Sequence, residues 1–376
     1  MPDRLATLSA NATPVSIAID MPEPRSQRIV IGKGEPALTV HVRNERGERA
    51  VRSLEELEIC DAFIRGDLDF EGDLSAAASI HRVLSDSQWW IKTWRRLKPV
   101  FLGRRRVNPE WIALHYDSDN VQLIATDQDW HVYTPGIYES DADTLEAGAC
   151  RKLENAYTML RLGPGKTLLE VGCGWGGFTR YCAQRRVKVT GITLSRHQLE
   201  YSKALMAQEG LSAALMYHDF FDYAPAEQYD AVSAMGVIED LSDYKRVMQC
   251  LARLVKPGGR VFLDFATSKA RFGTASFITK YIWPGTFRMV YLPELMDAIS
   301  HSVFELLDMR NDRHNYYLWA RENYRRWIEH KAEIVAKKGE ALWRTFHLMH
   351  AGTTAVMRDA ESGVSAYRMV LQRRLA

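Results

Sequence analysis

Apolar and polar residues follow a repeating pattern along the larger, second part of the chain. From about Lys152 onward, short apolar runs rich in β-branched residues are each followed by an amphipathic helical stretch. The runs are TLLEVGCG, VKVTGITL, AALMYHD, YDAVSAMG, GRVFLDFA, SVFELLDM and YRMVLQR. This alternation predicts an α/β domain with a parallel, seven-stranded sheet and helices on both faces.

The amino-terminal part of the chain has a different pattern. Residues 1–26 are polar, small and interrupted by proline, which predicts a flexible arm. RIVIGKG and ALTVHVRN have the composition of strands, a turn is expected near Glu48, and SLEELEICDAFIRGDLDFEG is a charged helical stretch. We therefore expect a small α+β domain over residues 27–87.

Residues 88–111, QWWIKTWRRLKPVFLGRRRVNPEW, are rich in basic and aromatic side chains. Between Gln88 and Arg106 there are seven basic residues and no acidic one. Rings beside a dense basic face suit the boundary between headgroups and acyl chains, so we expect contact with the inner face of a membrane. A docked linker and a surface that stacks single-stranded nucleic acid are the alternatives. The membrane-binding residues would be Trp89, Trp90, Trp94, Arg95, Arg96, Arg104, Arg105 and Arg106.

Composition limits the kind of protein that this chain forms. Its 376 residues include 49 Lys and Arg, 47 Asp and Glu, and 46% hydrophobic residues, which favours a folded protein of two or three domains. The net charge of +2 argues against a protein whose whole surface binds nucleic acid, but says nothing about local basic patches. Five scattered cysteines without a CxxC pair indicate neither a disulfide framework nor a thiolate zinc site. Because no secretory signal and no membrane-spanning run is visible, we expect a cytoplasmic protein.

The glycine-rich run Glu170-Val-Gly-Cys-Gly-Trp-Gly-Gly177 follows the first apolar run and precedes a helical stretch. Glycines are needed where a backbone turns tightly and lies against a ligand. Gly172, Gly174 and Gly177 satisfy GxGxxG, so a dinucleotide is one candidate ligand. A dinucleotide site also needs an acidic residue about 20 residues further on, where this chain has Thr193. S-adenosylmethionine, which is positively charged and has no phosphate, suits the loop better.

The glycine run and its surroundings resemble the cofactor-binding core of the cyclopropane-fatty-acyl-phospholipid synthases and mycolic acid cyclopropane synthases. GCGWGG together with GITLSRHQ carries the resemblance, which continues in RGDLDFEGDL, HYDSDN, KYIWPG and GEALWRTFHLMHAG. It covers the chain from about residue 30 to its end. The resemblance implies a class I methyltransferase fold with a Rossmann-like sheet over residues 112–376, preceded by a lipid-binding-like domain over residues 27–87.

The same resemblance implies the ligands. The cofactor would be S-adenosylmethionine, and the substrate would be a cis double bond in an unsaturated acyl chain of a membrane phospholipid. The residues implied in cofactor binding are Tyr133, Thr134, Glu170, Gly172, Cys173, Gly174, Trp175, Gly176, Gly177, Thr193, Leu194, Ser195, Gln198, Asp219 and Phe220.

In the cyclopropane synthases a bound bicarbonate takes a proton from the added methyl group and closes the ring, and here its site departs from the family pattern. The family Cys is Pro135, the family His is Asp264, and Glu239 matches the family Glu only after a one-residue shift. An anionic Asp264 would repel bicarbonate. We therefore expect methylation without ring closure, with cyclopropanation as the alternative. The candidate catalytic residues are Glu239, Tyr316, Asp264 and His115.

Methylation without ring closure gives a methyl-alkene, or a methyl-branched or furan-precursor chain if a separate reductase or oxidase completes the product. Aromatic faces would stabilise the cation formed on the acyl chain. The candidates are Trp175, Tyr281, Trp283, Tyr316 and Tyr317. No metal site is expected, because His347 and His350 stand three apart without a third ligand. A non-catalytic paralogue that binds lipid and cofactor, and assembly into a homo-oligomer, stay open.

Overall fold

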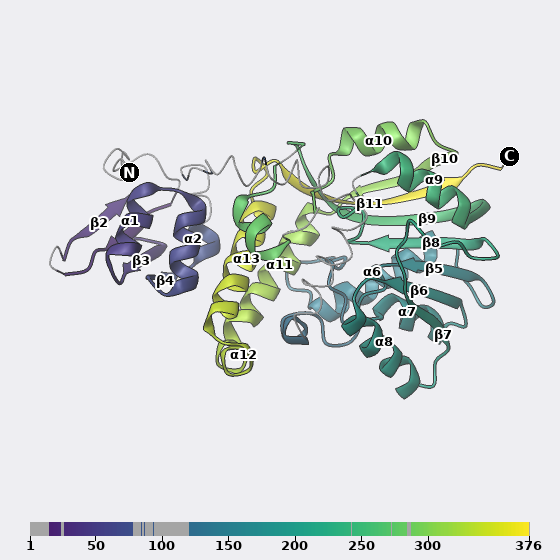
Figure 1. The fold of residues 1–376 in the computed structure, drawn as a ribbon, viewed down its shortest axis with the longest axis horizontal. Helices are drawn as coiled ribbons and strands as arrows, with labels where there is room; N and C mark the ends of the chain where they lie inside the picture. Colours follow the sequence, from purple (N-terminus) through teal and green to yellow (C-terminus); the bar gives the residue numbers. More distant parts are fainter. Residues whose placement is uncertain are drawn as a thin grey trace. The chain divides into compact units, whose positions relative to one another are not determined.

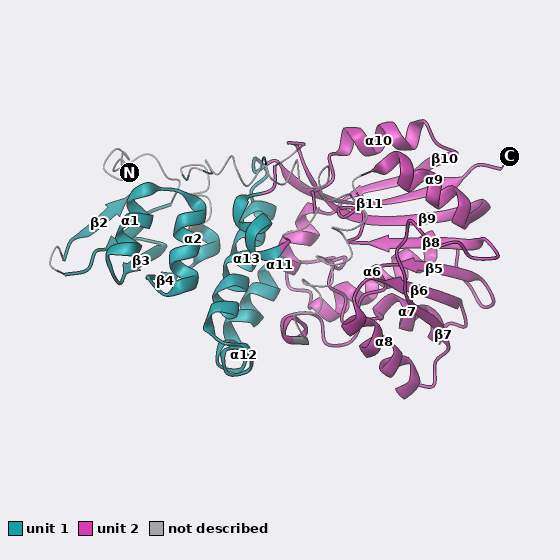
Figure 2. Cartoon of the chain, viewed as in Figure 1, with its two compact units in different colours: residues 1–96, 275–282, 320–362 teal, residues 97–274, 283–319, 363–376 magenta. Residues whose placement is uncertain are grey.

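The computed structural model describes residues 15–23, 26–77, 84, 86, 93, 120–241, 243–271, 273–283 and 287–375. It divides into two compact units, each made of separate stretches of the chain (Figure 2). Unit 1 comprises residues 1–96, 275–282 and 320–362, and unit 2 comprises residues 97–274, 283–319 and 363–376. The domain boundaries expected from the sequence stay predictions, because compactness does not test independent folding.

Two of the expectations fall on parts of the chain that the structure does not describe. The basic aromatic segment lies outside the described residues except for Thr93, and His115 lies outside them as well. Membrane contact through that segment therefore stays a prediction. Among the helices of the described residues, none is both long enough and apolar enough to cross a bilayer.

Unit 2 is built on a seven-stranded sheet, in the order β10-β11-β9-β8-β5-β6-β7 (Figure 1). All seven apolar runs form strands of this sheet, as predicted. Pairs from β9 to β7 are parallel, but β11 runs antiparallel to both of its neighbours, so the sheet is mixed. The strands are β5 (Thr167–Val171), β6 (Lys188–Thr193), β7 (Ala213–Tyr217), β8 (Tyr229–Met235), β9 (Val255–Ser268), β10 (Phe304–Asn311) and β11 (Val364–Arg373).

Helices cover both faces of this sheet because successive side chains of a strand point to opposite faces. Leu168 of β5 belongs to the apolar cluster formed with α6 and α7, whereas Leu169 belongs to the cluster formed with α9 and α10. α8 packs through Leu199 against Leu215 of β7. The predicted three-layer α/β arrangement is thus confirmed. The helices are α6 (Leu145–Met159), α7 (Gly177–Gln184), α8 (Arg196–Gln208), α9 (Tyr244–Leu254) and α10 (Leu292–Ser300).

Unit 1 contains a four-stranded sheet in the order β2-β1-β3-β4. The flexible arm predicted for residues 1–26 is wrong for β1, which lies between β2 and β3 and buries Ile17 and Ile19. The turn predicted near Glu48 is wrong too, because Glu48 lies inside helix α1, which Asn44 caps by accepting the N–H groups of Arg46 and Gly47. The stretch SLEELEICDAFIRGDLDFEG is helical only as far as Arg65, because its last residues pair with β3 as strand β4. The elements are β1 (Ile17–Asp20), β2 (Arg28–Ile31), β3 (Leu38–Val42), α1 (Glu45–Ser53), α2 (Glu56–Arg65), β4 (Leu68–Gly72) and α3 (Leu74–Ala77).

Carboxy-terminal helices complete unit 1. Trp327 of α11 and Trp343 of α13 exchange hydrogen bonds, because each indole N–H donates to the other residue's carbonyl oxygen, at 3.1 and 3.2 Å. Both indoles are buried, which fixes the two helices side by side. The remaining elements are a 3₁₀ helix (Asn120–Ile124), a π-helix (Ile278–Ile282), α11 (Arg313–Glu329), α12 (Lys331–Lys338) and α13 (Glu340–Arg358).

Candidate functional site

The glycine loop joins the end of β5 to the start of α7. Gly172, Gly174 and Gly176 have φ angles of +70°, +52° and +84°, a backbone conformation that other residues rarely adopt. A Cβ at Gly172 would lie 2.4 Å from Cγ2 of Val237, whereas one at Gly174 would meet no protein atom nearer than 3.9 Å. The loop therefore needs glycine for its turn at Gly172 and leaves open space beside Gly174.

A pocket of unit 2 lies beside this loop at the carboxyl ends of β5, β6, β7 and β8. β5 is the strand where the chain order reverses, with β6 on one side and β8 on the other, and α/β sheets bind ligands at such a switch point. The predicted cofactor residues that line the pocket are Tyr133, Thr134, Glu170, Gly172, Cys173, Gly174, Trp175, Gly177, Thr193, Leu194, Gln198, Asp219 and Phe220.

Two predicted cofactor residues do not line the pocket. Gly176 is the residue that precedes α7, and Ser195 caps α8 by accepting the N–H of Gln198 at 3.2 Å. Thr193 lines the pocket and accepts the N–H of Ser195 through its hydroxyl oxygen at 3.1 Å. Gly176 and Ser195 thus support the loops that bear the lining residues.

The wall that carries Tyr133 and Thr134 is held by a buried carboxylate that the sequence did not reveal. Asp127 accepts the N–H groups of Trp130 at 2.6 Å and Val132 at 2.7 Å, so the backbone before Tyr133 is fixed. Burial raises the pKa of Asp127 to about 6. His131 also lines the pocket, where its Nδ1 lies 2.7 Å from the hydroxyl of Tyr201. Neither His131 nor Asp127 lies in a sequence motif from which its role could have been predicted.

The pocket is lined by acidic groups, whose ionised forms a cationic ligand would stabilise. Glu170 and Asp240 line it, and burial raises their pKa values to about 8 and about 7. Glu170 Oε2 accepts the hydroxyl of Thr179 at 2.5 Å, which fixes the carboxyl against α7. No Lys or Arg of the described ranges lines the pocket. The residues fit S-adenosylmethionine, whose sulfonium and ammonium are positive, and do not fit a pyrophosphate.

Glu239 lies near this pocket, in the turn between β8 and α9. Its Oε1 accepts the N–H of Ala266 at 2.8 Å, and its buried Oε2 has no hydrogen-bond partner in the described part of the chain. Burial raises the pKa of Glu239 to about 8, and the charges of Asp240 and Asp264 act in the same direction. α9 begins at Tyr244 and Asp243 caps it, so Glu239 is not a helix-capping residue.

Tyr316 of α11 is brought close to the same carboxyls. Burial raises its phenol pKa, and the charges of Glu239 and Asp264 raise it further. The ring of Tyr316 meets Trp319 edge-on, with centroids 5.3 Å apart, and Tyr133 meets the same indole at 6.2 Å. Three predicted catalytic residues of unit 2 therefore lie in one cluster beside an aromatic wall.

Asp264 is not the isolated anion that the sequence suggested. It forms an ion pair with Lys152 of α6, which also donates to the hydroxyl of Thr134. Lys152 interrupts the otherwise apolar and small-residue face of α6 that is buried against the sheet, and that interruption is the signal that sequence analysis could have used. The family's Cys position is Pro135, which has no side-chain donor. Asp264, which is paired with Lys152, and Pro135 thus offer bicarbonate no hydrogen-bond donor at these two positions, and the residues present do not fit it.

Other predicted residues lie elsewhere. Trp283 stacks on Phe287 with ring centroids 4.2 Å apart. His314, beside Tyr317, lies at the surface with its Nε2 2.8 Å from Asp141 Oδ1. Tyr281 belongs to unit 1, where its hydroxyl donates to Asp61 at 2.7 Å.

The two histidines of α13 are structural. His347 stacks on Trp343 at 4.6 Å, and burial lowers its pKa to about 4 and that of His350 to about 3. Within the described residues, no group of three or more His, Cys, Asp or Glu is arranged to hold a metal ion.

Comparisons with known proteins agree on one family. The model of the mycolic acid cyclopropane synthetase family matches residues 103–366. A probable fatty acid methyltransferase of Pseudomonas putida is 28% identical over 330 residues, which are 83% of this chain and 82% of that protein. The cyclopropane-fatty-acyl-phospholipid synthase of Escherichia coli K12 is 30% identical over 241 residues, 62% of this chain and 60% of that protein.

Solved structures agree with the fold. A mycolic acid cyclopropane synthase in complex with SAH and CTAB superposes with a TM-score of 0.65 at 21% identity, covering 70% of this chain and 98% of that one. These comparisons confirm three predictions: the class I methyltransferase fold, the resemblance to this family, and S-adenosylmethionine as the cofactor. The chain belongs to the mycolic acid cyclopropane synthetase family of S-adenosylmethionine-dependent methyltransferases.

Proposed function

We propose that this enzyme methylates a carbon of a cis double bond in unsaturated phospholipid acyl chains, and that it does so without closing a cyclopropane ring. The observation that carries this proposal is the buried carboxyl of Glu239, whose Oε2 has no hydrogen-bond partner in the described residues and which lies beside Tyr316. A fatty acyl substrate is supported by the relatives, which are named fatty acid methyltransferase and cyclopropane-fatty-acyl-phospholipid synthase.

The cofactor would be held by the glycine loop, the acidic groups of the pocket and the wall at Tyr133 and Thr134. When bound, S-adenosylmethionine supplies an electrophilic methyl group, and the alkene supplies the electron pair that forms the new carbon–carbon bond. This leaves a carbocation on the acyl chain. The rings of Tyr133, Tyr316 and Trp319 lie together, and we assign them the stabilisation of this positive charge.

The carbocation becomes neutral when a neighbouring carbon loses a proton. We assign Glu239 as the acceptor of that proton, because its Oε2 is unpartnered and its raised pKa gives it the proton affinity of a base near neutral pH. Loss of the proton from a chain carbon gives a methyl-alkene. Loss from the added methyl group gives a cyclopropane, which is the alternative product. The lack of a bicarbonate site at Pro135 and Asp264 favours the first outcome.

Lipid mass spectrometry tests the proposal. The chain would be expressed in a bacterial host whose phospholipids are monounsaturated, beside a host that carries the Glu239→Gln variant. We expect unsaturated chains to gain the mass of one CH₂ group only with the unmodified protein. Oxidative cleavage of the double bond then separates a methyl-alkene, which is cleaved, from a cyclopropane, which is not. Unchanged lipids would contradict the proposal.

Binding of SAH separates the enzyme from a paralogue that has lost its cofactor, and methyl transfer to lipid separates it from a paralogue that still binds the cofactor. Calorimetry should detect SAH at the pocket, and the absence of heat would favour a paralogue that has lost its cofactor. Two further expectations stay predictions from sequence. These are contact of the basic aromatic segment with the membrane and a reductase or oxidase partner that completes the product.

A further inference from the structure

A buried ion pair lies next to the proposed proton acceptor and has no assigned role. The side chains of Lys152 and Asp264 are only 3% and 5% exposed. Two charges removed from water in this way destabilise a fold unless each compensates the other, and packing alone does not require them. A buried pair that contacts Thr134 of the pocket and lies beside Glu239 points to a role in the reaction.

The pair is connected to Glu239 through strand β9. Ala266, whose N–H binds Glu239 Oε1 at 2.8 Å, stands two residues after Asp264, so both positions share one face of the strand. The carbonyl oxygen of Asp264 accepts the N–H of Gly236 at 2.8 Å, and Gly236 begins the turn that carries Glu239. The charge of Asp264 acts on Glu239 and disfavours a second anion there.

Several elements bring charged or titratable groups toward Glu239. They are Asp240 beside it in the turn, Asp264 on β9, Tyr316 on α11, Tyr244 on α9 and Arg288, whose main-chain N–H donates to the carbonyl oxygen of Glu239 at 3.0 Å. Asp264 also interacts with Asp312, which forms an ion pair with Arg368 at 3.3 Å. Lys152 is the buried cation that contacts Asp264 directly, so its charge offsets the anion nearest to Glu239 on β9.

We propose that Lys152 is a positioning residue for methyl transfer: by compensating Asp264 it allows Glu239 to be ionised as the proton acceptor. This inference rests on the proposed function. It predicts opposite effects of the two charges on the ionisation of Glu239, because the Lys152 cation favours the ionised carboxylate and the Asp264 anion disfavours it. Removing Lys152 should therefore raise the pH at which activity appears, and removing the Asp264 charge should lower it.

Lys152 also donates to Thr134 on the cofactor side of the pocket. A variant that lacks this lysine should therefore bind the cofactor somewhat less tightly. This effect changes the affinity for SAH and the KM for S-adenosylmethionine, whereas the electrostatic effect changes the pH midpoint of kcat. The two can be measured separately.

The experiment compares five forms of the full chain: wild type, K152M, D264N, the double variant K152M/D264N, and K203M as a control at an exposed lysine of α8. Vesicles of monounsaturated phospholipid are incubated with S-adenosylmethionine that carries a labelled methyl group. The methyl groups transferred to lipid are counted across neutral and alkaline pH, and the midpoint of the rising limb of kcat is fitted. Calorimetry gives the SAH affinity of each form.

We expect the midpoint to rise by about one pH unit in K152M and to fall by about one unit in D264N. The double variant should return near wild type, and K203M should not differ from it. General loss of structure lowers rates but does not shift midpoints in opposite directions. If K152M does not fold, the double variant must still have a higher midpoint than D264N.

Equal midpoints in all forms, or shifts of one sign, would overturn the role of Lys152 while leaving methyl transfer established. If the wild type transfers no methyl group to lipid, the proposed function falls and this inference falls with it.

Discussion

The carboxyl of Glu239 illustrates how a single residue acquires chemistry from its surroundings. Water stabilises an ionised carboxyl, and Glu239 is only 5% exposed, so its pKa is raised to about 8. The N–H of Ala266 fixes one oxygen and leaves the other available. A base of this kind holds a proton more strongly than an exposed carboxylate while remaining partly ionised near neutral pH.

Glu239→Gln tests this role. The amide has the same shape but cannot accept the proton, so kcat should fall by about two to four orders of magnitude. The affinity for SAH should change little, because Glu239 does not line the cofactor pocket. The matched control is Glu305→Gln, at an exposed position of β10, which should keep full activity. A Glu239→Gln variant with wild-type kcat would contradict the assignment.

The same variant should alter how stability depends on pH. The ordinary pKa of Glu239 is 4.5 and the folded value is about 8, so between these values the folded state binds more protons than the unfolded state. Stability is therefore lost as pH rises from about 4.5 to about 8. Denaturant unfolding should show that Glu239→Gln loses less stability than the wild type over this pH range. Part of the loss should remain in the variant, because the pKa of Glu170 is raised in the same way.

At the scale of elements, the glycine loop combines a strained backbone angle with close packing. Gly172→Ala would place alanine at a φ of +70°, which it adopts poorly, and would add a Cβ only 2.4 Å from Cγ2 of Val237. Gly210→Ala is the matched control, because its φ is +65° but its Cβ would meet no atom within 4 Å. Both should lose about 1 kcal/mol of stability from the backbone angle. Calorimetry should show that only Gly172→Ala also loses affinity for SAH, by more than about tenfold; equal affinities would contradict the loop's role.

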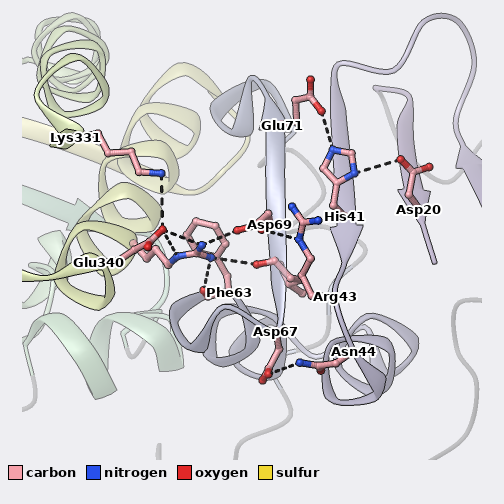
Figure 3. Close-up of polar contacts among 12 residues, drawn as sticks. Asp20, His41, Arg43, Asn44, Phe63, Asp67, Asp69, Glu71, Lys331 and Glu340 are labelled. Carbon is pink, nitrogen blue, oxygen red and sulfur yellow. Dashed lines mark hydrogen bonds and ion pairs between the residues drawn. The ribbon is translucent and has the colours of Figure 1, made fainter. Parts of the chain in front are cut away.

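Within unit 1, Arg344 of α13 is bonded to two other elements. Its guanidinium donates to the carbonyl oxygens of Phe63 and Leu68 and binds Asp69 at 2.7 Å. Figure 3 shows the polar contacts around Phe63, Asp69 and Glu340. Arg344→Ala should cost about 2 kcal/mol, since the side chain is 12% exposed and its partners lose their donors. Arg325→Ala should cost less than about 0.5 kcal/mol, because the Arg325 side chain in its ion pair with Glu322 is 54% exposed. Equal losses in thermal unfolding would contradict this account.

Helices and strands with a clear pattern of apolar residues could be predicted from the sequence, and those without one could not. Seven apolar runs gave seven strands, because each contributes at least one buried apolar side chain to the core around the sheet. β1 was missed because four residues, Ile17–Asp20, lie in a polar, proline-containing stretch and are strand only through pairing with β2 and β3. α1 was missed because its cap at Asn44 is a local hydrogen bond that a search for apolar runs does not detect.

At the scale of the whole molecule, contacts between distant parts of the chain determine what sequence reasoning misses. The glycine loop and its neighbours lie close together in sequence, so most of the cofactor pocket could be predicted. Lys152 and Asp264 are far apart in sequence, and their pairing depends on α6 lying over β9. Unit 1 likewise combines residues 1–96 with residues 320–362, a grouping that no local pattern indicates.

The most direct measurement of the central claim is the fate of the methyl hydrogens. The purified protein is incubated with vesicles of monounsaturated phospholipid and S-adenosylmethionine that carries a fully deuterated methyl group, and the acyl chains are analysed by mass spectrometry. Methylation without ring closure, with the proton taken from the acyl chain, predicts a product that keeps all three deuterium atoms. A product that keeps only two and also resists oxidative cleavage would show that the base took a proton from the added methyl group and closed a cyclopropane, which would contradict the account.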